Sequence, residues 1–207
     1  MNAGYLWPQY SIHRGKLLGL LHNAVVGRLG KDRIHTGHKV VDCGSNDSGA
    51  WAQFELRNDD AGSSAKIVDA DVVVGCDGIH SKVREVLVEP QPPRWIGITM
   101  LRGLTKMKPF LDGRTMTIIG PIQQEMVIYP ISKEVEDEDS NEALVNWVAL
   151  MKVEDNDSSM LEQWNIEVDD LDGAIKPFED FKYGFLDVPK MIRSAEKVYQ
   201  YPMIDRT

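Results

Sequence analysis

Apolar residues recur every three or four positions near the start of the chain, which predicts an amphipathic helix from about residue 13 to residue 28. We expect the apolar face of this helix to be buried, with Ser11 as its N-cap and Gly30 just beyond its last turn. The apolar positions of that face are Leu17, Leu21, Ala24, Val25 and Leu29.

After this helix the pattern changes to short runs of apolar and β-branched residues, separated by glycine, asparagine and serine. Such runs predict an antiparallel meander, because the polar segments between them have the composition of tight turns. The predicted strands are 33–36, 39–43, 50–56 and 66–68.

The next segment is different, because the three consecutive valines 72–74 suit a strand buried on both faces of a parallel sheet. Cys76-Asp77-Gly78 ends this strand, and Ser81 is the predicted N-cap of a short helix. Ligands of open α/β sheets bind at such strand ends, where a helix N-terminus offers free amides. Gly78 would let a ligand approach the backbone, and Asp77 would accept hydrogen bonds. A simple capped turn without a ligand is the alternative.

Three prolines between residues 90 and 93 predict a stiff break, which we take as a domain boundary between residues 1–90 and residues 94–207. The acidic stretch 134–142 is predicted to be a solvated hairpin loop, because so many carboxylates repel one another when they are packed. The predicted strands after the break are 95–104, 115–119, 126–130 and 145–153.

Composition limits the classes of function. A chain of 207 residues, 43% of them hydrophobic, can bury a sizeable core, and its net charge of −9 argues against general nucleic-acid binding. Cys43 and Cys76 form neither a disulfide framework nor a metal motif, which favours reduced thiols in the cytoplasm. We expect no signal peptide and no membrane span, because no window approaches the ~18 apolar residues that a span requires.

Arg14 is a candidate binding residue, because a cation in the first turn of a helix opposes the helix dipole. It therefore needs a compensating anion, which is either a bound ligand or, as the alternative, a local carboxylate. The chain has no Ser-His-Asp arrangement, and its five histidines lack the spacing of metal ligands. We therefore predict no catalytic side chain and no metal site.

Two strings make the sequence recognisable. His13-Arg14 at the start of the helix and Gly75-Cys76-Asp77-Gly78-Ile79-His80-Ser81 resemble the group A flavoprotein monooxygenases, which are single-component aromatic hydroxylases. Other strings, among them Tyr129-Pro130-Ile131-Ser132 and Tyr201-Pro202-Met203, are similar to the phenazine-modifying branch, the 5-methylphenazine-1-carboxylate 1-monooxygenases. The resemblance implies an enzyme that uses FAD, NADH or NADPH, and molecular oxygen to hydroxylate an aromatic or phenazine-like small molecule.

The same resemblance implies roles for individual residues. It places Arg14 near the flavin or its pyrophosphate and the backbone of Val40 near the adenine. Asp77 and Gly78 belong to the fingerprint that contacts the cofactor. Apart from the resemblance, the aromatic and methionine residues of the second half could line a substrate cavity between the two domains, with ordinary packing in the core as the alternative. These residues are Met100, Met126, Tyr129, Trp147 and Met151, and we predict that Tyr129 contacts the substrate. The cofactor carries the difficult chemistry in this family, which agrees with the lack of a catalytic motif.

Two family segments do not occur in these 207 residues: the Gly-x-Gly-x-x-Gly turn that holds the FAD pyrophosphate, and the Gly-Asp motif that follows the substrate domain. The predicted fold is therefore α/β, with a partial, Rossmann-like FAD-binding domain (1–90) and a substrate domain on a mixed or antiparallel sheet (94–207). Together these domains resemble an internal fragment of a longer enzyme.

Leu101 departs from the phenazine branch, where tryptophan is usual, and would reshape the pocket if this position faced the substrate. The alternatives to an enzyme are a non-catalytic remnant and an interaction module, neither of which binds flavin. The sequence predicts no particular oligomeric state.

Overall fold

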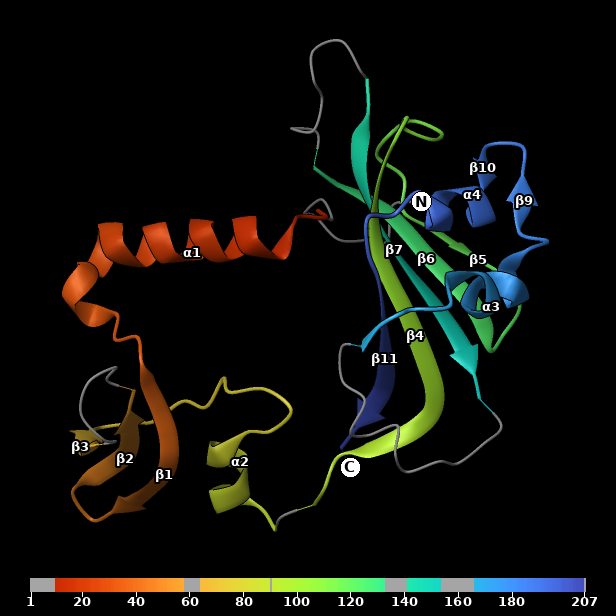
Figure 1. Cartoon of the computed structure of the whole chain (residues 1–207). Coiled ribbons are helices and arrows are strands. Elements are labelled where there is room, and N and C mark those ends of the chain that lie inside the picture. Colours follow the sequence, from red (N-terminus) through yellow and green to blue (C-terminus); the bar gives the residue numbers. More distant parts are fainter. Residues whose placement is uncertain (1–9, 58–63, 90, 133–140, 154–165, 207) are drawn as a thin grey trace, which may run out of the picture. The chain divides into compact units, whose positions relative to one another are not determined.

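The structure is a computed structural model that describes residues 10–57, 64–89, 91–132, 141–153 and 166–206 (Figure 1). The chain forms two compact units, which are described separately below. One unit takes in the chain up to Gly19 and again from Trp95 to Ile204, and the other comprises Leu20–Arg94 with the last three residues. Helix α1 (Arg14–Leu29) contributes residues to both units.

The unit that begins at Leu20 is built on a three-stranded antiparallel sheet in the order β1-β2-β3. Its strands are β1 (His38–Asn46), β2 (Gly49–Leu56) and β3 (Ser64–Ala70), and the short helix α2 (Lys82–Leu87) contacts β1. The predicted meander is thus confirmed from residue 38 onward. The predicted strand 33–36 is wrong, because the chain forms a 3-10 turn, η1 (Lys31–Arg33), after Gly30.

Two burial predictions for this part of the chain are also wrong. The valines 72–74 belong to no sheet, and the side chains of Val72 and Val74 are 71% and 78% exposed. Helix α1 forms at the predicted place, but none of its residues is buried. The physical reason is the same in both cases: an apolar pattern is buried only when another element covers it, and within the described ranges no strand pairs with residues 72–74.

The other unit is built on a six-stranded sheet in the order β5-β6-β7-β4-β11-β8 (Figure 1). The pairs β5·β6, β6·β7, β4·β7 and β8·β11 are antiparallel. All four strands predicted after the proline break are present. The strands are β4 (Arg94–Met107), β5 (Thr117–Ile119), β6 (Gln124–Ser132), β7 (Ala143–Lys152), β8 (Ile166–Glu167) and β11 (Val198–Asp205).

The predicted acidic loop connects β6 to β7, whose antiparallel pairing agrees with a hairpin at this place. Most of the loop, residues 134–140, lies outside the described ranges. Mixed helices and antiparallel sheets confirm the α/β class of the chain. The functional division into a FAD-binding part and a substrate part stays a prediction.

Short elements cover one face of the six-stranded sheet (Figure 1). Two of the helices in this layer begin at aspartate caps: Asp170 accepts a hydrogen bond from the amide of Gly173, and Asp187 accepts one from the amide of Lys190. The elements are α3 (Leu171–Ile175), η3 (Lys176–Phe178), β9 (Lys182–Tyr183), β10 (Leu186–Asp187) and α4 (Val188–Arg193).

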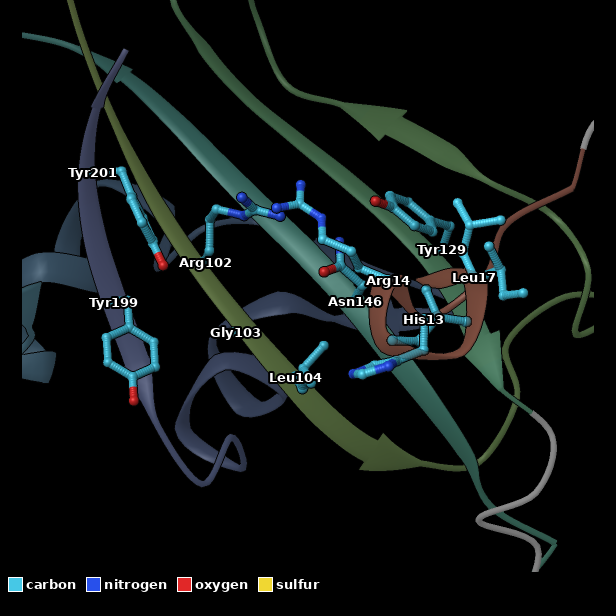
Figure 2. Close-up of a pocket in the computed structure, with 12 residues that line it drawn as sticks. His13, Arg14, Leu17, Arg102, Gly103, Leu104, Tyr129, Asn146, Tyr199 and Tyr201 are labelled. Atoms are coloured by element: carbon cyan, nitrogen blue, oxygen red, sulfur yellow. The ribbon is translucent and has the colours of Figure 1, made fainter. Parts of the chain in front are cut away.

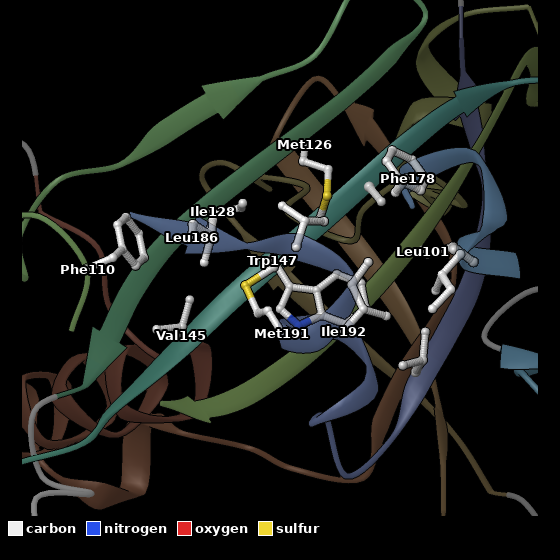
Figure 3. Close-up of a cluster of buried hydrophobic side chains, with 14 residues drawn as sticks. Leu101, Phe110, Met126, Ile128, Val145, Trp147, Phe178, Leu186, Met191 and Ile192 are labelled. Atoms are coloured by element: carbon white, nitrogen blue, oxygen red, sulfur yellow. The ribbon is translucent and has the colours of Figure 1, made fainter. Parts of the chain in front are cut away.

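Trp147 lies at the centre of the core between the sheet and these short elements (Figure 3). Its indole N–H donates to the hydroxyl of Thr105 over 3.0 Å, and that hydroxyl donates to the carbonyl of Met191 over 2.9 Å. A side chain at Gly103 would overlap the indole ring, so only glycine fits at this point of β4. The core therefore ties β4, β7 and α4 together through both packing and hydrogen bonds.

Candidate functional site

The face of the sheet opposite this core carries the candidate site. Side chains alternate along a strand, so Val145 and Trp147 point into the core while Asn146 between them points the other way. Asn146 is paired with Tyr129 of β6 on one side and with Leu104 of β4 on the other. Three neighbouring strands thus place a row of side chains on this face.

A cavity of about 490 Å³ opens over this row (Figure 2). Its walls come from the start of α1 and from strands β4, β6, β7 and β11, and all of them belong to one unit. Among the described residues the lining is aromatic and basic, with three tyrosines and two arginines and without any aspartate or glutamate. The lining residues are Ile12, His13, Arg14, Leu17, Arg102, Gly103, Leu104, Tyr129, Ile131, Asn146, Tyr199 and Tyr201.

The start of α1 is fixed differently from the sequence prediction. The ring Nδ1 of His13 accepts a hydrogen bond from the amide of Gly15, so His13 takes the capping role. The predicted N-cap, Ser11, instead donates its hydroxyl hydrogen bond to the carbonyl of Pro130 in β6, over 2.5 Å. Ser11 therefore holds the helix start against the sheet and positions Arg14 at the cavity.

Arg14 lies in the first turn of α1, which contains no acidic residue. Its side chain is exposed and, within the described ranges, forms no ion pair with a carboxylate. The alternative that a local carboxylate compensates Arg14 therefore finds no support there. A guanidinium at the positive end of a helix is suited to a bound anion.

Arg102 and Asn146 are two half-buried polar residues that line the cavity from the sheet. The guanidinium carbon of Arg102 lies 5.7 Å from the centre of the Tyr201 ring, within the range of a cation–π interaction. The amide Nδ2 of Asn146 is buried and has no hydrogen-bond partner among the described residues. A buried donor without a partner is unfavourable.

Asp77 lies in the other unit and is occupied by its own helix. Its carboxylate accepts hydrogen bonds from the hydroxyl of Ser81 over 2.5 Å and from the backbone amides of Lys82 and Val83. The Ser81 hydroxyl in turn accepts from the amide of Arg84. The expectation that this helix offers free amides to a ligand is therefore wrong, because two side chains cap its first turn.

Gly75 and Gly78 shape the turn around Asp77. Gly78 has a φ of 81°, and nothing lies within 4 Å of the place where its Cβ would be, so its backbone is open to an approaching group. A Cβ at Gly75 would collide with the side chain of Val83, so glycine allows the turn to pack against α2. Val40 is half-buried in β1, beside an irregularity of pairing between Val40 and Asp42.

The structure brings two of the five predicted site residues together: Arg14 and Tyr129 line the same cavity. Val40, Asp77 and Gly78 belong to the other unit. Their roles toward cofactor and substrate stay predictions. Sequence reasoning missed Arg102 and Asn146, although the alternation along β4 and β7 could have placed both on the polar face of the sheet.

Three other residues that the sequence suggested as cavity lining lie in or against the hydrophobic core instead. The sequence suggested that Met126, Trp147 and Met151 could line a cavity, but the first two are fully buried in the core and Met151 packs against it. Leu101, which replaces the usual tryptophan, is also fully buried there. This replacement therefore changes the core beneath β4 and leaves the lining of the cavity unaltered.

The described residues contain no group of three or more His, Cys, Asp or Glu side chains that could hold a metal ion. Cys43 is buried and Cys76 exposed, and both are unpaired thiols. Burial raises the pKa of the Cys43 thiol, and the nearby carboxylates of Asp42 and Asp77 add to this effect. No helix in the described part of the chain is long and apolar enough to cross a membrane.

Replacing Asp77 with asparagine is expected to reduce the acid sensitivity of the unit that contains it. The hydrogen bond from Ser81 and those from the α2 backbone hold the pKa of Asp77 below its ordinary value of 3.8, against an opposing effect of burial. A pKa lowered by folding stabilises the protein above the ordinary value, and this contribution is lost as the pH falls through the lowered pKa. Thermal melts from about pH 6 down to about pH 2 should show the unaltered protein losing stability more steeply than Asp77→Asn. Equal acid sensitivity in both proteins would show that Asp77 does not stabilise this unit.

No family model matches the sequence. A phenazine 1,6-dicarboxylic acid hydroxylase of Lysobacter antibioticus is 36% identical over 209 residues, which cover 99% of this chain and 49% of the relative. The chain spans about half the length of this curated relative. The homologues of this chain are FAD-dependent aromatic monooxygenases. The resemblance stated from the sequence is thereby confirmed, and the 36% identity supports the phenazine branch of these monooxygenases.

Solved structures of monooxygenases share the fold. The 2,6-dihydroxypyridine-3-hydroxylase of Arthrobacter nicotinovorans superposes with a TM-score of 0.54 at 18% identity, covering 89% of this chain and 48% of that protein. A FAD-containing monooxygenase of Photorhabdus luminescens also reaches 0.54, at 19% identity, covering 88% of this chain and 50% of that protein. At such identities the likeness to these structures shows the fold alone.

Proposed function

We propose that this chain is part of a FAD-dependent monooxygenase that uses NADH or NADPH to hydroxylate an aromatic, phenazine-like small molecule. The observation that carries the proposal is the cavity lined by tyrosines and arginines, in a chain whose phenazine hydroxylase relative matches it over nearly its whole length. The cavity has the mixed character of small-molecule sites, with apolar and aromatic walls and a few polar groups. A cytoplasmic location is part of the proposal and rests on the two unpaired thiols.

The residues present fit FAD in two respects. Arg14 offers a guanidinium without a carboxylate partner in the described ranges, which suits the negatively charged pyrophosphate. Gly78 leaves its backbone open to the approach of a ligand. Asp77 keeps its charge through its hydrogen bonds, so in our proposal it accepts hydrogen bonds from the cofactor and does not contact the phosphates. We also propose that the backbone of Val40 contacts the adenine of FAD.

When bound and reduced, FAD would supply the activation of molecular oxygen that hydroxylation of an electron-rich ring requires. The chain's own residues bind and orient that ring. Tyr129 and Tyr201 offer aromatic surface on opposite sides of the cavity in Figure 2, and Ile131 and Leu104 add apolar walls. These walls exclude water from the ring and favour one orientation of it. No side chain of the cavity needs to exchange a proton with the substrate in this scheme.

The test uses protein expressed from the gene, with this chain and all coding sequence on either side of it. Purified protein should bind FAD, and NADH or NADPH oxidation should be coupled to the appearance of a hydroxylated phenazine carboxylic acid, measured by chromatography and mass spectrometry. Protein that folds, retains no flavin and forms no product would support the alternative of a non-catalytic remnant or an interaction module.

A further inference from the structure

A second pocket lies beside the candidate cavity in the same unit. Its volume is about 580 Å³, which is within the usual range of small-molecule sites. Leu104 and Lys106 of β4, Leu144 of β7 and Tyr199 of β11 line it, together with the segment that precedes β11. All of these residues belong to the unit that contains the cavity over the sheet. The proposed function does not account for this space.

Two residues join the cavity to the second pocket. Leu104 and Tyr199 line both spaces, so the two adjoin at these side chains. Leu104 pairs with Asn146 across the β4·β7 ladder, and Lys106 pairs with Leu144. Because side chains two residues apart on a strand share a face, the second pocket continues the row of the cavity by one step of about 7 Å. The two spaces therefore follow one another along the same face of the sheet.

The inner lining of the second pocket is apolar. The side chains of Leu144 and Tyr199 are half-buried there, and Leu104 is 37% exposed. The other lining residues are polar or charged and are exposed, so they form the rim of the pocket. These rim residues are Lys106, Ser194, Glu196 and Lys197.

Two of the rim residues use their polar groups elsewhere. The ammonium of Lys197 lies 3.0 Å from the carboxylate of Glu167 on β8, and the hydroxyl of Ser194 donates to the carbonyl of Lys190 over 2.9 Å. Lys197 thus offers the pocket chiefly its carbon stem, because its charged end is held by another residue. An occupant of this pocket would gain affinity mainly by removing apolar surface from water.

We propose that the second pocket is a subsite for an apolar substituent of the ligand whose ring lies in the cavity, and that this substituent passes between Leu104 and Tyr199. The inference rests on the proposed function, because it extends the substrate class of the same site. Continuity favours the ligand itself as the occupant, since the two spaces share two side chains of their walls. The class of ligand is therefore a planar aromatic ring that carries an alkyl chain of several carbons.

The test compares N-methyl and N-hexyl phenazinecarboxamides, with the amide at ring position 1 or 2, by calorimetric titration of the full chain. The hexyl compound has five more methylenes, and each methylene removed from water strengthens binding about fourfold. Because the rim leaves part of the chain exposed, we expect the hexyl compound to bind about ten- to a hundredfold more tightly than the methyl compound at one of the two positions. In Leu144→Trp, which fills the subsite from β7, this ratio should fall close to one.

Ile118→Trp is the matched control, because Ile118 is 62% exposed on the edge strand β5 and lines neither space. This variant should keep the full ratio of hexyl to methyl affinity. Equal binding of the hexyl and methyl compounds by the unaltered protein at both ring positions would overturn the inference. A ratio that survives in folded Leu144→Trp would also overturn it.

A second variant separates recognition from folding. Leu144→Ala enlarges the subsite, so it should bind an octyl chain better relative to a hexyl chain than the unaltered protein does. Circular dichroism is recorded on each variant. If Leu144→Trp does not fold, an unchanged ratio of octyl to hexyl affinity in Leu144→Ala would overturn the inference.

Failure of this inference can be distinguished from failure of the proposed function. Binding of the alkylated compounds is measured without flavin, reductant or turnover. A protein that retains FAD and hydroxylates an aromatic ring, but gains no affinity from the hexyl chain, would contradict the subsite alone. A protein that prefers the hexyl compound and loses this preference in Leu144→Trp, but never binds FAD, would contradict the monooxygenase proposal alone.

Discussion

Arg14→Gln is expected to weaken FAD retention about ten- to a hundredfold, because a charge-assisted hydrogen bond contributes about 1.5–3 kcal/mol. The residue stands in a helix turn that contains no acidic side chain, and no acidic residue in the described part of the chain lines the cavity. An anion of the cofactor would therefore be its first compensating partner. The measurement is a flavin titration of the protein expressed with its flanking coding sequence.

Arg28→Gln is the matched control for this experiment, because it removes the same charge from the last turn of the same helix. It should leave FAD affinity unchanged. Thermal melts without flavin should show that Arg14→Gln is as stable as the unaltered protein, because the cation opposes the helix dipole there. If both arginine variants retain FAD as well as the unaltered protein, Arg14 is a surface residue without a role in cofactor binding.

Trp147→Ala should lower the free energy of unfolding of its unit by about 3–5 kcal/mol, the usual cost of removing a large aromatic side chain from a core. The ring is fully buried and lies against Gly103, where no side chain fits beside it. The substitution also takes the indole N–H away from the hydroxyl of Thr105. Urea unfolding followed by circular dichroism measures the change.

Trp147→Phe provides the comparison, because it keeps most of the buried ring and removes chiefly the N–H donor. Its loss of stability should be clearly smaller than that of Trp147→Ala. A loss below about 1 kcal/mol for the alanine variant would mean that the core is not organised around this residue, since such small effects are typical of surface substitutions.

Local patterns predicted the elements of this chain well where a strand or helix is defined by its own residues. The strand-like run of β7 and the turn chemistry between β1 and β2 were sufficient to place these strands within a few residues. Helix α1 begins one residue from its predicted start. Such features depend on neighbours along the chain, which is why a single sequence reveals them.

Burial was harder to predict, because it depends on what covers a surface. The valines 72–74 have the composition of an internal strand, yet no strand in the described ranges pairs with them. The apolar face of α1 is likewise exposed. Whether Leu101 faces the substrate was left open by the sequence, and it lies in the core, because its place in the alternation of β4 points it to the face opposite the cavity.

The candidate site could be predicted only in part, because it combines residues that are far apart in the sequence. Arg14 was found through its conflict with the helix dipole, and Tyr129 as one of the aromatic and methionine residues in the second half of the chain. Arg102 and Asn146 carry no such local signal, and only the register between β4, β6 and β7 brings them beside Tyr129. The capping of α2 by Asp77 shows the opposite case, in which a turn typical of ligand sites also has a local structural role.

The most direct test of the monooxygenase assignment is the origin of the oxygen atom in the product. The protein is expressed with its flanking coding sequence and is supplied with FAD, NADPH or NADH, and phenazine-1-carboxylate. The reaction runs under oxygen gas enriched in the heavy isotope, and mass spectrometry measures the mass of the product. We expect a hydroxylated product that carries one heavy oxygen atom and forms only when flavin and reductant are both present. A product without the heavy isotope, or flavin-loaded protein that consumes reductant without hydroxylating any aromatic acid, would contradict the assignment.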